Sequence, residues 1–239
     1  MSTEMTAALI ELSRQRQAEF DSELSAWRDS DGKGLRLWCG PGCGNCCSLA
    51  VNTTLPEALA IADSLTDGQR QQVAAAIARI TTHARESTDA RGFLAGYRRA
   101  VGSCPFLDAE ASCSIYPVRP LACRALLATR PPDWCGVNLA ELPELERNGF
   151  LSSLDRSVVA FPTHYAAAPQ ELAANFERGL GFAMIRFVGF GVTGNLPLLV
   201  WLAGQAGFIE ALSGGPATFL QFLSTHQIHQ PFLVQIDVP

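Results

Sequence analysis

The cysteines of this chain are crowded into one short segment. Four of them, Cys39, Cys43, Cys46 and Cys47, fall within nine residues, among glycines and a proline in the string LWCGPGCGNCCS. Glycine permits tight backbone turns, so the segment is expected to curl as a loop. Eight cysteines in 239 residues are too few for a disulfide scaffold. Because thiolates are good ligands for zinc, copper(I) and iron–sulfur clusters, the segment predicts a metal-binding loop.

The charge and apolar content of the chain exclude several classes of protein. With 48% hydrophobic and 17% charged residues, the sequence can form a core and does not resemble a disordered chain. The net charge is −5 and no long basic run occurs, so no nucleic-acid partner is expected. The first sixteen residues, MSTEMTAALIELSRQR, lack an apolar stretch of signal-peptide length. We therefore expect a cytoplasmic protein.

The hydrophobic pattern is mostly helical. A capping box with proline in its first turn, Thr54-Leu55-Pro56-Glu57, predicts a helix that continues to about Leu65. Apolar periodicity and breaks at glycine and proline predict the other helices. Their approximate ranges are 6–28, 67–80, 89–101, 120–130, 139–159, 170–190 and 196–212, with a last short helix after the break at 214–216.

The segment CPFLDAEASCSIYP, residues 104–117, has two short apolar runs around a polar turn and predicts a small β-hairpin. The fold class expected is thus mainly α, a helical domain with a Gly/Cys-rich metal-binding loop and a small β-hairpin. We expect an N-terminal helix in residues 1–34, a cysteine-cluster metal-binding domain in 35–136, and a helical C-terminal region, 137–239, packed on the same core.

One stretch, residues 187–209, contains no charged residue and has the length of a bilayer-spanning helix. Glycines, Asn195 and Pro197 interrupt it, and no basic flank would orient it in a membrane. We interpret 194–197 as a turn between two buried helices. We therefore expect a buried helical pair or an interface with a protein partner in this apolar C-terminal region, and not membrane association.

The cysteines continue beyond the first cluster, in the string CPFLDAEASCSIYPVRPLACR, residues 104–124. Together the two strings resemble the zinc- or iron-chelating cysteine-cluster family, the CxxCxxCC or YkgJ-type proteins. The resemblance covers about a third of the chain, from Leu37 to Ala125. It implies a metal and, as its ligands, the seven motif cysteines Cys39, Cys43, Cys46, Cys47, Cys104, Cys113 and Cys123.

Seven cysteines are more than one tetrahedral zinc or one four-iron cluster needs. Either the site is polynuclear, or some thiols are redox-active or structural, and the sequence does not choose the ligating four. The sequence leaves two interpretations of Cys135, which lies outside the motif: a buried thiol with no metal-binding role, or a further ligand.

The spacing Cys39-x3-Cys43-x2-Cys46 also occurs in radical S-adenosylmethionine enzymes, but the helices expected after it do not fit their partial barrel. The cysteine run of a bacterial ferredoxin is absent.

Three motif residues, Tyr116, Arg119 and Arg124, are candidates for binding the cofactor. The guanidinium groups of Arg119 and Arg124 are suited to donate hydrogen bonds to cluster thiolates or to an anionic substrate, and an ion pair with a nearby carboxylate is the alternative. A packed hairpin position is the alternative for Tyr116. The pair His226 and His229 has no acidic or thiol partner nearby in sequence and is interpreted as surface or core.

These patterns lead to three hypotheses of function. The first is a metal-binding protein that holds an iron–sulfur cluster or iron, with zinc as the alternative, and acts in redox, metal handling or cofactor assembly. The second, implied by the resemblance, is a cluster-dependent enzyme that modifies a protein or small molecule, such as a methyltransferase or oxidoreductase. An apolar cavity that opens onto the cysteines would favour this enzyme. The third is a structural zinc domain.

Overall fold

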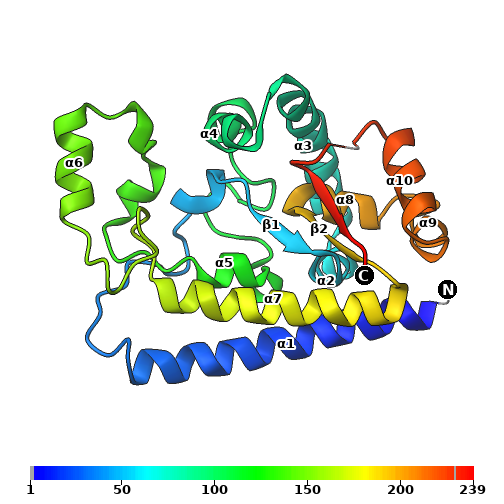
Figure 1. The fold of residues 1–239 in the computed structure, drawn as a ribbon, viewed down its shortest axis with the longest axis horizontal. Coiled ribbons are helices and arrows are strands. Elements are labelled where there is room, and N and C mark those ends of the chain that lie inside the picture. The colour runs from blue at the N-terminus through cyan, green and yellow to red at the C-terminus, as the bar shows by residue number, and fades with distance from the viewer. Residues whose placement is uncertain (1–2, 229) are drawn as a thin grey trace.

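The computed structural model of the protein describes residues 3–228 and 230–239, and over these residues the chain is mainly helical, as the sequence predicts (Figure 1). His229 lies outside the described residues. The helices are α1 (Thr3–Asp29), α2 (Leu55–Ser64), α3 (Asp67–Glu86), α4 (Ala90–Ala100), α5 (Leu121–Ala125), α6 (Glu144–Ser152), α7 (Ala167–Val188), α8 (Leu196–Ala203), α9 (Phe208–Ser213) and α10 (Pro216–Thr225).

Three short strands, β1 (Asn52–Thr54), β2 (Gly191–Asn195) and β3 (Val234–Asp237), form an antiparallel sheet in the order β1-β2-β3. The register pairs Thr54 with Thr193 and Gly191 with Asp237. The turn predicted between two helices at 194–197 is therefore wrong: β2 ends there and α8 begins. Gly194 is required in this strand, because a Cβ would lie only 2.2 Å from the Leu233 carbonyl oxygen.

The helix starts follow the capping signals. The Thr54 backbone N–H and hydroxyl both donate to Glu57 at the start of α2, at 3.0 and 2.8 Å. A second capping box, Thr66 with Gln69, starts α3, and the Asp89 side chain caps α4. Local side-chain chemistry therefore sets these boundaries.

The sequence prediction differs from the structure in four helical or hairpin segments. The helix expected over 120–130 is only α5, because the chain leaves the helix after Ala125. The helix expected over 139–159 is only α6, and the one expected over 196–212 is broken into α8 and α9 at Gly207, whose φ is +79°. The expected hairpin is reduced to an isolated antiparallel bridge between Leu107 and Cys113. Its turn is closed by the Asp108 carboxylate, which accepts from the backbone N–H groups of Glu110 and Ser112.

The long helices α1 and α7 lie side by side along one face of the molecule, and α7 also packs on α5 and β2 (Figure 1). One core cluster joins α2, α3 and α4 to α8, α9 and α10, while a second joins α1, α5 and α7 through Phe20, Leu121 and Leu180. Within residues 3–228 and 230–239, no helix is both long and apolar enough to cross a bilayer.

Candidate metal centre

Six of the seven motif cysteines line a single small cavity. The cavity has a volume of about 70 Å³. That volume holds a few water-sized atoms, well below the several hundred cubic ångströms of a typical organic-ligand pocket. The six thiols that line it are those of Cys43, Cys46, Cys47, Cys104, Cys113 and Cys123.

Backbone contacts bring the two halves of the cysteine motif together. The Cys104 N–H donates to the Cys47 carbonyl at 2.6 Å, which joins the loop after α4 to the one-turn 3₁₀ helix Asn45–Ser48. At Gly44 a Cβ would lie 2.9 Å from Leu107 and 3.1 Å from the Ala111 carbonyl oxygen. The glycine among the cysteines therefore permits close packing of the first loop against the Leu107–Cys113 turn.

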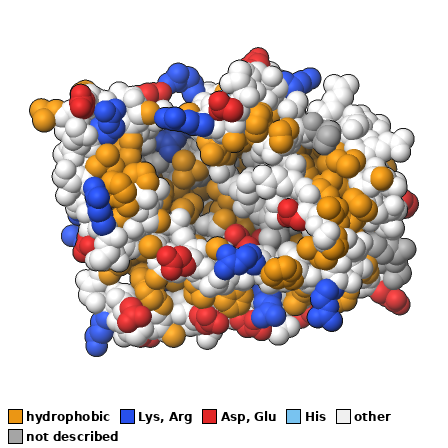
Figure 2. Space-filling view, in the orientation of Figure 1, with side chains coloured by type: hydrophobic (Ala, Val, Ile, Leu, Met, Phe, Trp, Pro, Cys, Tyr) orange, Lys and Arg blue, Asp and Glu red, His pale blue; other side chains and the backbone are white. Residues whose placement is uncertain are grey.

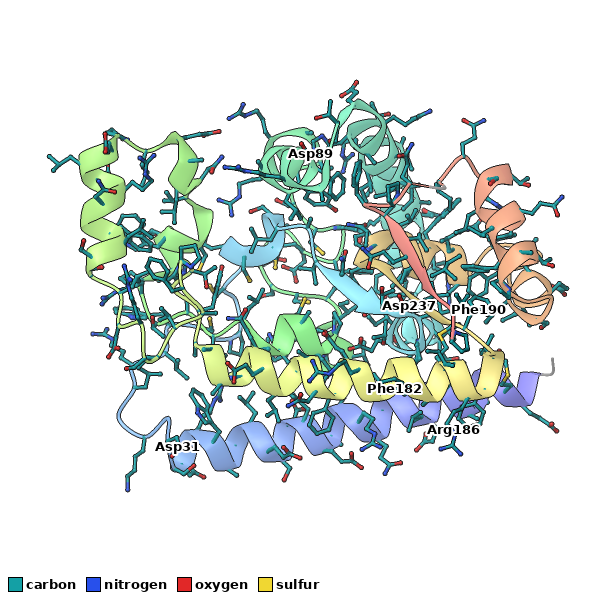
Figure 3. All side chains as sticks on the ribbon, viewed as in Figure 1. Asp31, Asp89, Phe182, Arg186, Phe190 and Asp237 are labelled. Carbon is teal, nitrogen blue, oxygen red and sulfur yellow. The ribbon has the colours of Figure 1, made fainter. Side chains whose placement is uncertain are left out.

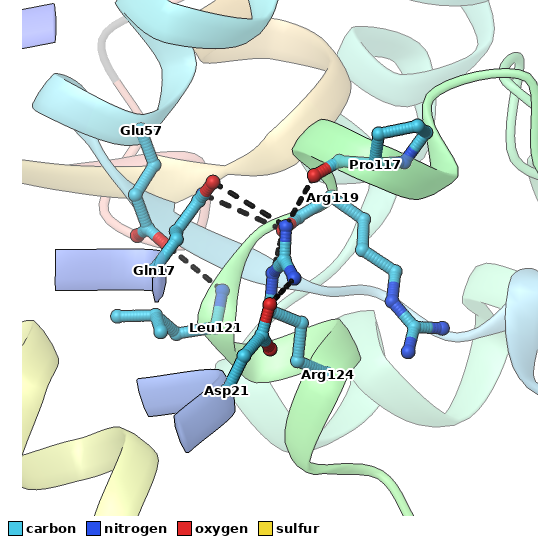
Figure 4. Close-up of polar contacts among 7 residues, drawn as sticks. All are labelled: Gln17, Asp21, Glu57, Pro117, Arg119, Leu121 and Arg124. Atoms are coloured by element: carbon cyan, nitrogen blue, oxygen red, sulfur yellow. Dashed lines mark hydrogen bonds and ion pairs between the residues drawn. The ribbon is translucent and has the colours of Figure 1, made fainter. Parts of the chain in front are cut away.

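The short helix α5, which carries Cys123, is held from behind by two buried charged groups (Figure 4). The Leu121 N–H donates to the fully buried Glu57 carboxylate at 2.8 Å. The Arg124 guanidinium donates to the Pro117 and Arg119 carbonyls, at 2.5 and 2.8 Å, and pairs with Asp21 of α1 at 2.6 Å. Arg124 does not line the cavity. The structure thus gives it the ion pair that was the alternative to cofactor binding.

Arg119 and Tyr116, by contrast, line the cavity with the cysteines. The guanidinium carbon of Arg119 lies 4.0 Å from the centre of the Tyr116 ring. The Arg119 Nε is buried and has no hydrogen-bond partner among the described residues. A buried cationic donor without a protein acceptor is suited to an anionic group such as a thiolate.

Four thiols of the cavity, those of Cys46, Cys104, Cys113 and Cys123, have a raised pKa, and burial contributes to each shift. Burial raises the pKa of Cys104 to about 12 and the pKa of Cys123 well above its ordinary value. The hydrogen bond with Cys47, together with burial, raises the pKa of Cys46. The Arg119 charge opposes these shifts at Cys46, Cys113 and Cys123, so the pKa of each is raised less than it would be without that charge. Arg119 therefore favours the thiolate form that a metal requires.

The soft donor set and the partnerless Arg119 donor fit a thiolate-bound metal or cluster. Among the residues that the structure describes, no three His, Cys, Asp or Glu side chains already have an arrangement that could hold a metal ion. The comparisons with known proteins bear on the same segment. Residues 38–142 match the model of the CxxCxxCC family, described as "Putative zinc- or iron-chelating domain".

This segment is similar to the CxxCxxCC domain, and that name is used for it below. The family expected from the two cysteine strings is confirmed, and its description supports metal binding. No curated protein and no solved structure matches the chain. The match includes all seven motif cysteines, together with Tyr116, Arg119 and Arg124.

Cys39, the seventh motif cysteine of the CxxCxxCC domain, lies outside the cavity. Its sulfur donates to the Leu126 carbonyl at 3.2 Å and accepts the Ala128 N–H at 3.1 Å. Cys135 packs in the same small cluster, which also includes Cys46, and its sulfur lies 3.2 Å from the His164 Nε2. Two further thiols and an imidazole therefore stand beside the cavity.

Sequence reasoning missed several residues that line the cavity of the CxxCxxCC domain. Tyr97 reaches it from α4, and Leu196 and Pro197 reach it from the start of α8. The Asn195 side-chain amide donates to the Tyr97 hydroxyl at 3.2 Å, which fixes these two helices together. The Asn195–Pro197 break was visible in the sequence, but its approach to the cysteines depends on strand pairing that no local signal indicates. His164 gave no signal beyond its residue type.

Proposed function

We propose that the CxxCxxCC domain holds an iron-containing centre, an iron–sulfur cluster, in its cysteine cavity and acts in redox, metal handling or cofactor assembly. The observation that carries this proposal is that six cysteines line one cavity of about 70 Å³. Cys43, Cys46, Cys47, Cys104, Cys113 and Cys123 supply the candidate ligands, and Arg119 with Tyr116 lines the same space. A bound cluster would supply one-electron redox chemistry.

The number of thiols favours a cluster over a single zinc ion. Tetrahedral zinc is satisfied by four ligands, whereas this cavity presents six. A structural zinc site would also be expected to hold the fold together. Here α2, α3 and α8 pack through a core of aliphatic and aromatic side chains, and α1, α5 and α7 pack through another. Zinc remains the alternative metal.

A second candidate function, a cluster-dependent modifying enzyme, is favoured by a larger hollow beside the cysteines. This hollow has a volume of about 340 Å³ and is lined by residues of α5, α7 and the segment before β1. Leu49, Val51 and Leu126 line both this hollow and the cysteine cavity, so they form the boundary between the two. A substrate could therefore be held close to the centre without entering the cavity.

The proposal is tested by elemental analysis for iron, zinc and acid-labile sulfide on protein purified without oxygen. The test variant is the double substitution Cys43→Ser, Cys46→Ser. The matched control is Cys135→Ser, which changes a buried cysteine outside the cavity. We expect iron and sulfide in the wild type and in the control, and their loss in the double variant.

Circular dichroism distinguishes loss of the centre from loss of the fold. We expect the double variant to keep its helical spectrum. Zinc alone, at one ion per chain, with unfolding of the double variant would overturn the proposal in favour of a structural zinc domain. Iron and sulfide that persist in the double variant would place the centre elsewhere.

A further inference from the structure

A second and larger groove runs along α7, on the side of the sheet. It has a volume of about 470 Å³, within the range of pockets that bind small organic ligands. One wall is formed by α7, with Phe182 and Ile185, and the other by the three strands, with Thr193 and Asp237. Figure 3 shows Asp237 of β3 and Phe182 of α7 on the same face.

The groove combines two carboxylates with an apolar wall. Neither Glu177 nor Asp237 forms an ion pair with any described residue. The one cation of the lining is Arg178, which is exposed and donates to the Asn175 side chain on its own helix. Figure 2 shows acidic and basic side chains close together near the middle of this face. The lining therefore contains more negative than positive charge.

Glu177 lines the groove and forms no ion pair with the residues that the structure describes. It is half-buried, the charge of the buried Glu57 repels it, and it accepts a hydrogen bond from the Ala122 N–H of α5. Burial, with Glu57 as a second cause, raises the pKa of Glu177 to about 7. A cationic ligand group at this point would relieve the repulsion.

Glu177 also connects the groove to the hollow beside the cysteine cavity. Glu177 and Asn52 line both the groove and the hollow of about 340 Å³. That hollow shares Leu49, Val51 and Leu126 with the cysteine cavity. The three spaces therefore follow one another from the α7 groove to the thiols.

We propose that the α7 groove binds an organic cation, an amine with an apolar body, whose ammonium group pairs with Glu177 and whose body lies against Phe182 and Ile185. Asp237 adds negative charge at the groove, and the exposed Phe182 ring offers its face to the cation. The role of this molecule as a substrate rests on the proposed metal function, whereas its binding does not.

The experiment measures binding of hexylammonium, hexanol and hexanoate, three probes with similar apolar bodies and different head groups. Chemical shifts of backbone amides in ¹⁵N-labelled full-length protein report the site, with Gly181 and Thr193 as groove reporters. We expect hexylammonium at millimolar concentration to shift these amides more than hexanol does, and hexanoate not to shift them.

Three variants test which side chains of the groove contribute to the binding of hexylammonium. Glu177→Gln keeps an oxygen for the Ala122 N–H and removes the charge, so we expect hexylammonium binding to weaken at least about tenfold. Glu171→Gln changes an exposed carboxylate on the same helix outside the groove and is expected to leave binding unchanged. Phe182→Ala changes an exposed ring, which should not affect folding, and is expected to weaken both hexylammonium and hexanol.

Three outcomes would overturn the proposal: equal binding of hexanol and hexylammonium, preference for hexanoate, or no shift of groove amides at millimolar probe. The same titration on Cys43→Ser, Cys46→Ser protein separates this proposal from the metal function. Amine binding by that variant would support the groove even if the metal proposal fails. Loss of binding in that variant, with its helical spectrum intact, would overturn the independence of the groove from the centre.

Discussion

The polar groups behind the cysteine cavity differ sharply from those that face into it. Behind it, Glu57 accepts hydrogen bonds from Thr53, Thr54 and Leu121, and Arg124 contacts Asp21 and two carbonyls. Facing it, the Nε of Arg119 is buried without a partner in the described part of the chain, and six cysteines line a small cavity.

This difference separates a supporting layer from a binding layer. The supporting layer is satisfied by its own hydrogen bonds, so its contribution to stability does not depend on any bound group. The binding layer has a donor and thiols that the protein itself does not satisfy. We therefore expect substitutions behind the cavity to change stability and substitutions facing it to change metal retention.

The largest effect should come from Glu57→Ala. This change removes the acceptor of two buried backbone N–H groups and two hydroxyls, so we expect a loss of about 3–5 kcal/mol in the free energy of unfolding. Urea denaturation followed by circular dichroism measures it.

The matched control for Glu57→Ala is Gln69→Ala, because Gln69 occupies the same position in the second, exposed capping box. Only a cap is lost there, and we expect a cost of about 1 kcal/mol. Equal costs for the two variants would contradict a buried supporting role for Glu57.

Arg124→Met should have the next largest effect. Two partly buried carbonyls and Asp21 lose their donor, so we expect a loss of about 2–3 kcal/mol in the free energy of unfolding. Once folded, the variant should retain its metal as the wild type does, because Arg124 does not line the cavity. Denaturation and elemental analysis on the same preparation check both statements. Unchanged stability with loss of metal would contradict the supporting role given to Arg124 and would place it, like Arg119, among the residues that retain the metal.

Arg119→Met is expected to show the opposite pattern. Its Nε has no protein partner in the residues described, so the free energy of unfolding should change by less than about 1 kcal/mol. Loss of a positive charge that favours the thiolates should make the metal easier to remove. The rate of metal loss to a chelator measures this effect, and Arg119→Lys, which keeps the charge, should recover part of it.

The sequence could predict those parts of the fold that depend on local signals. The capping pairs Thr54 with Glu57 and Thr66 with Gln69 place the starts of α2 and α3. The sheet could not be predicted, because Asn52 pairs with Asn195 across more than half of the chain and each strand is very short. The two apolar runs that were expected to pair as a β-hairpin form only the isolated bridge between Leu107 and Cys113.

The candidate site was predictable in its residue types and less so in its geometry. The clustered cysteines indicated a metal, and the family match supports it. Nothing in the string RPLACR distinguishes Arg119 from Arg124, because the difference depends on Gln17 and Asp21 of a distant helix. The contributions of Tyr97 and Leu196 likewise depend on tertiary packing.

The smallest expected effect concerns Glu177 and the dependence of stability on pH. Burial and Glu57 raise the pKa of Glu177 from 4.5 to about 7, so between these values the folded state keeps a proton that the unfolded state has lost. Stability from this group therefore falls as pH rises through that window. Glu177→Gln carries no charge at any pH, so the free-energy difference between variant and wild type should move in favour of the variant as pH increases. Glu171→Gln, exposed on the same helix, should show no such trend, and parallel pH profiles for Glu177→Gln and wild type would contradict the raised pKa.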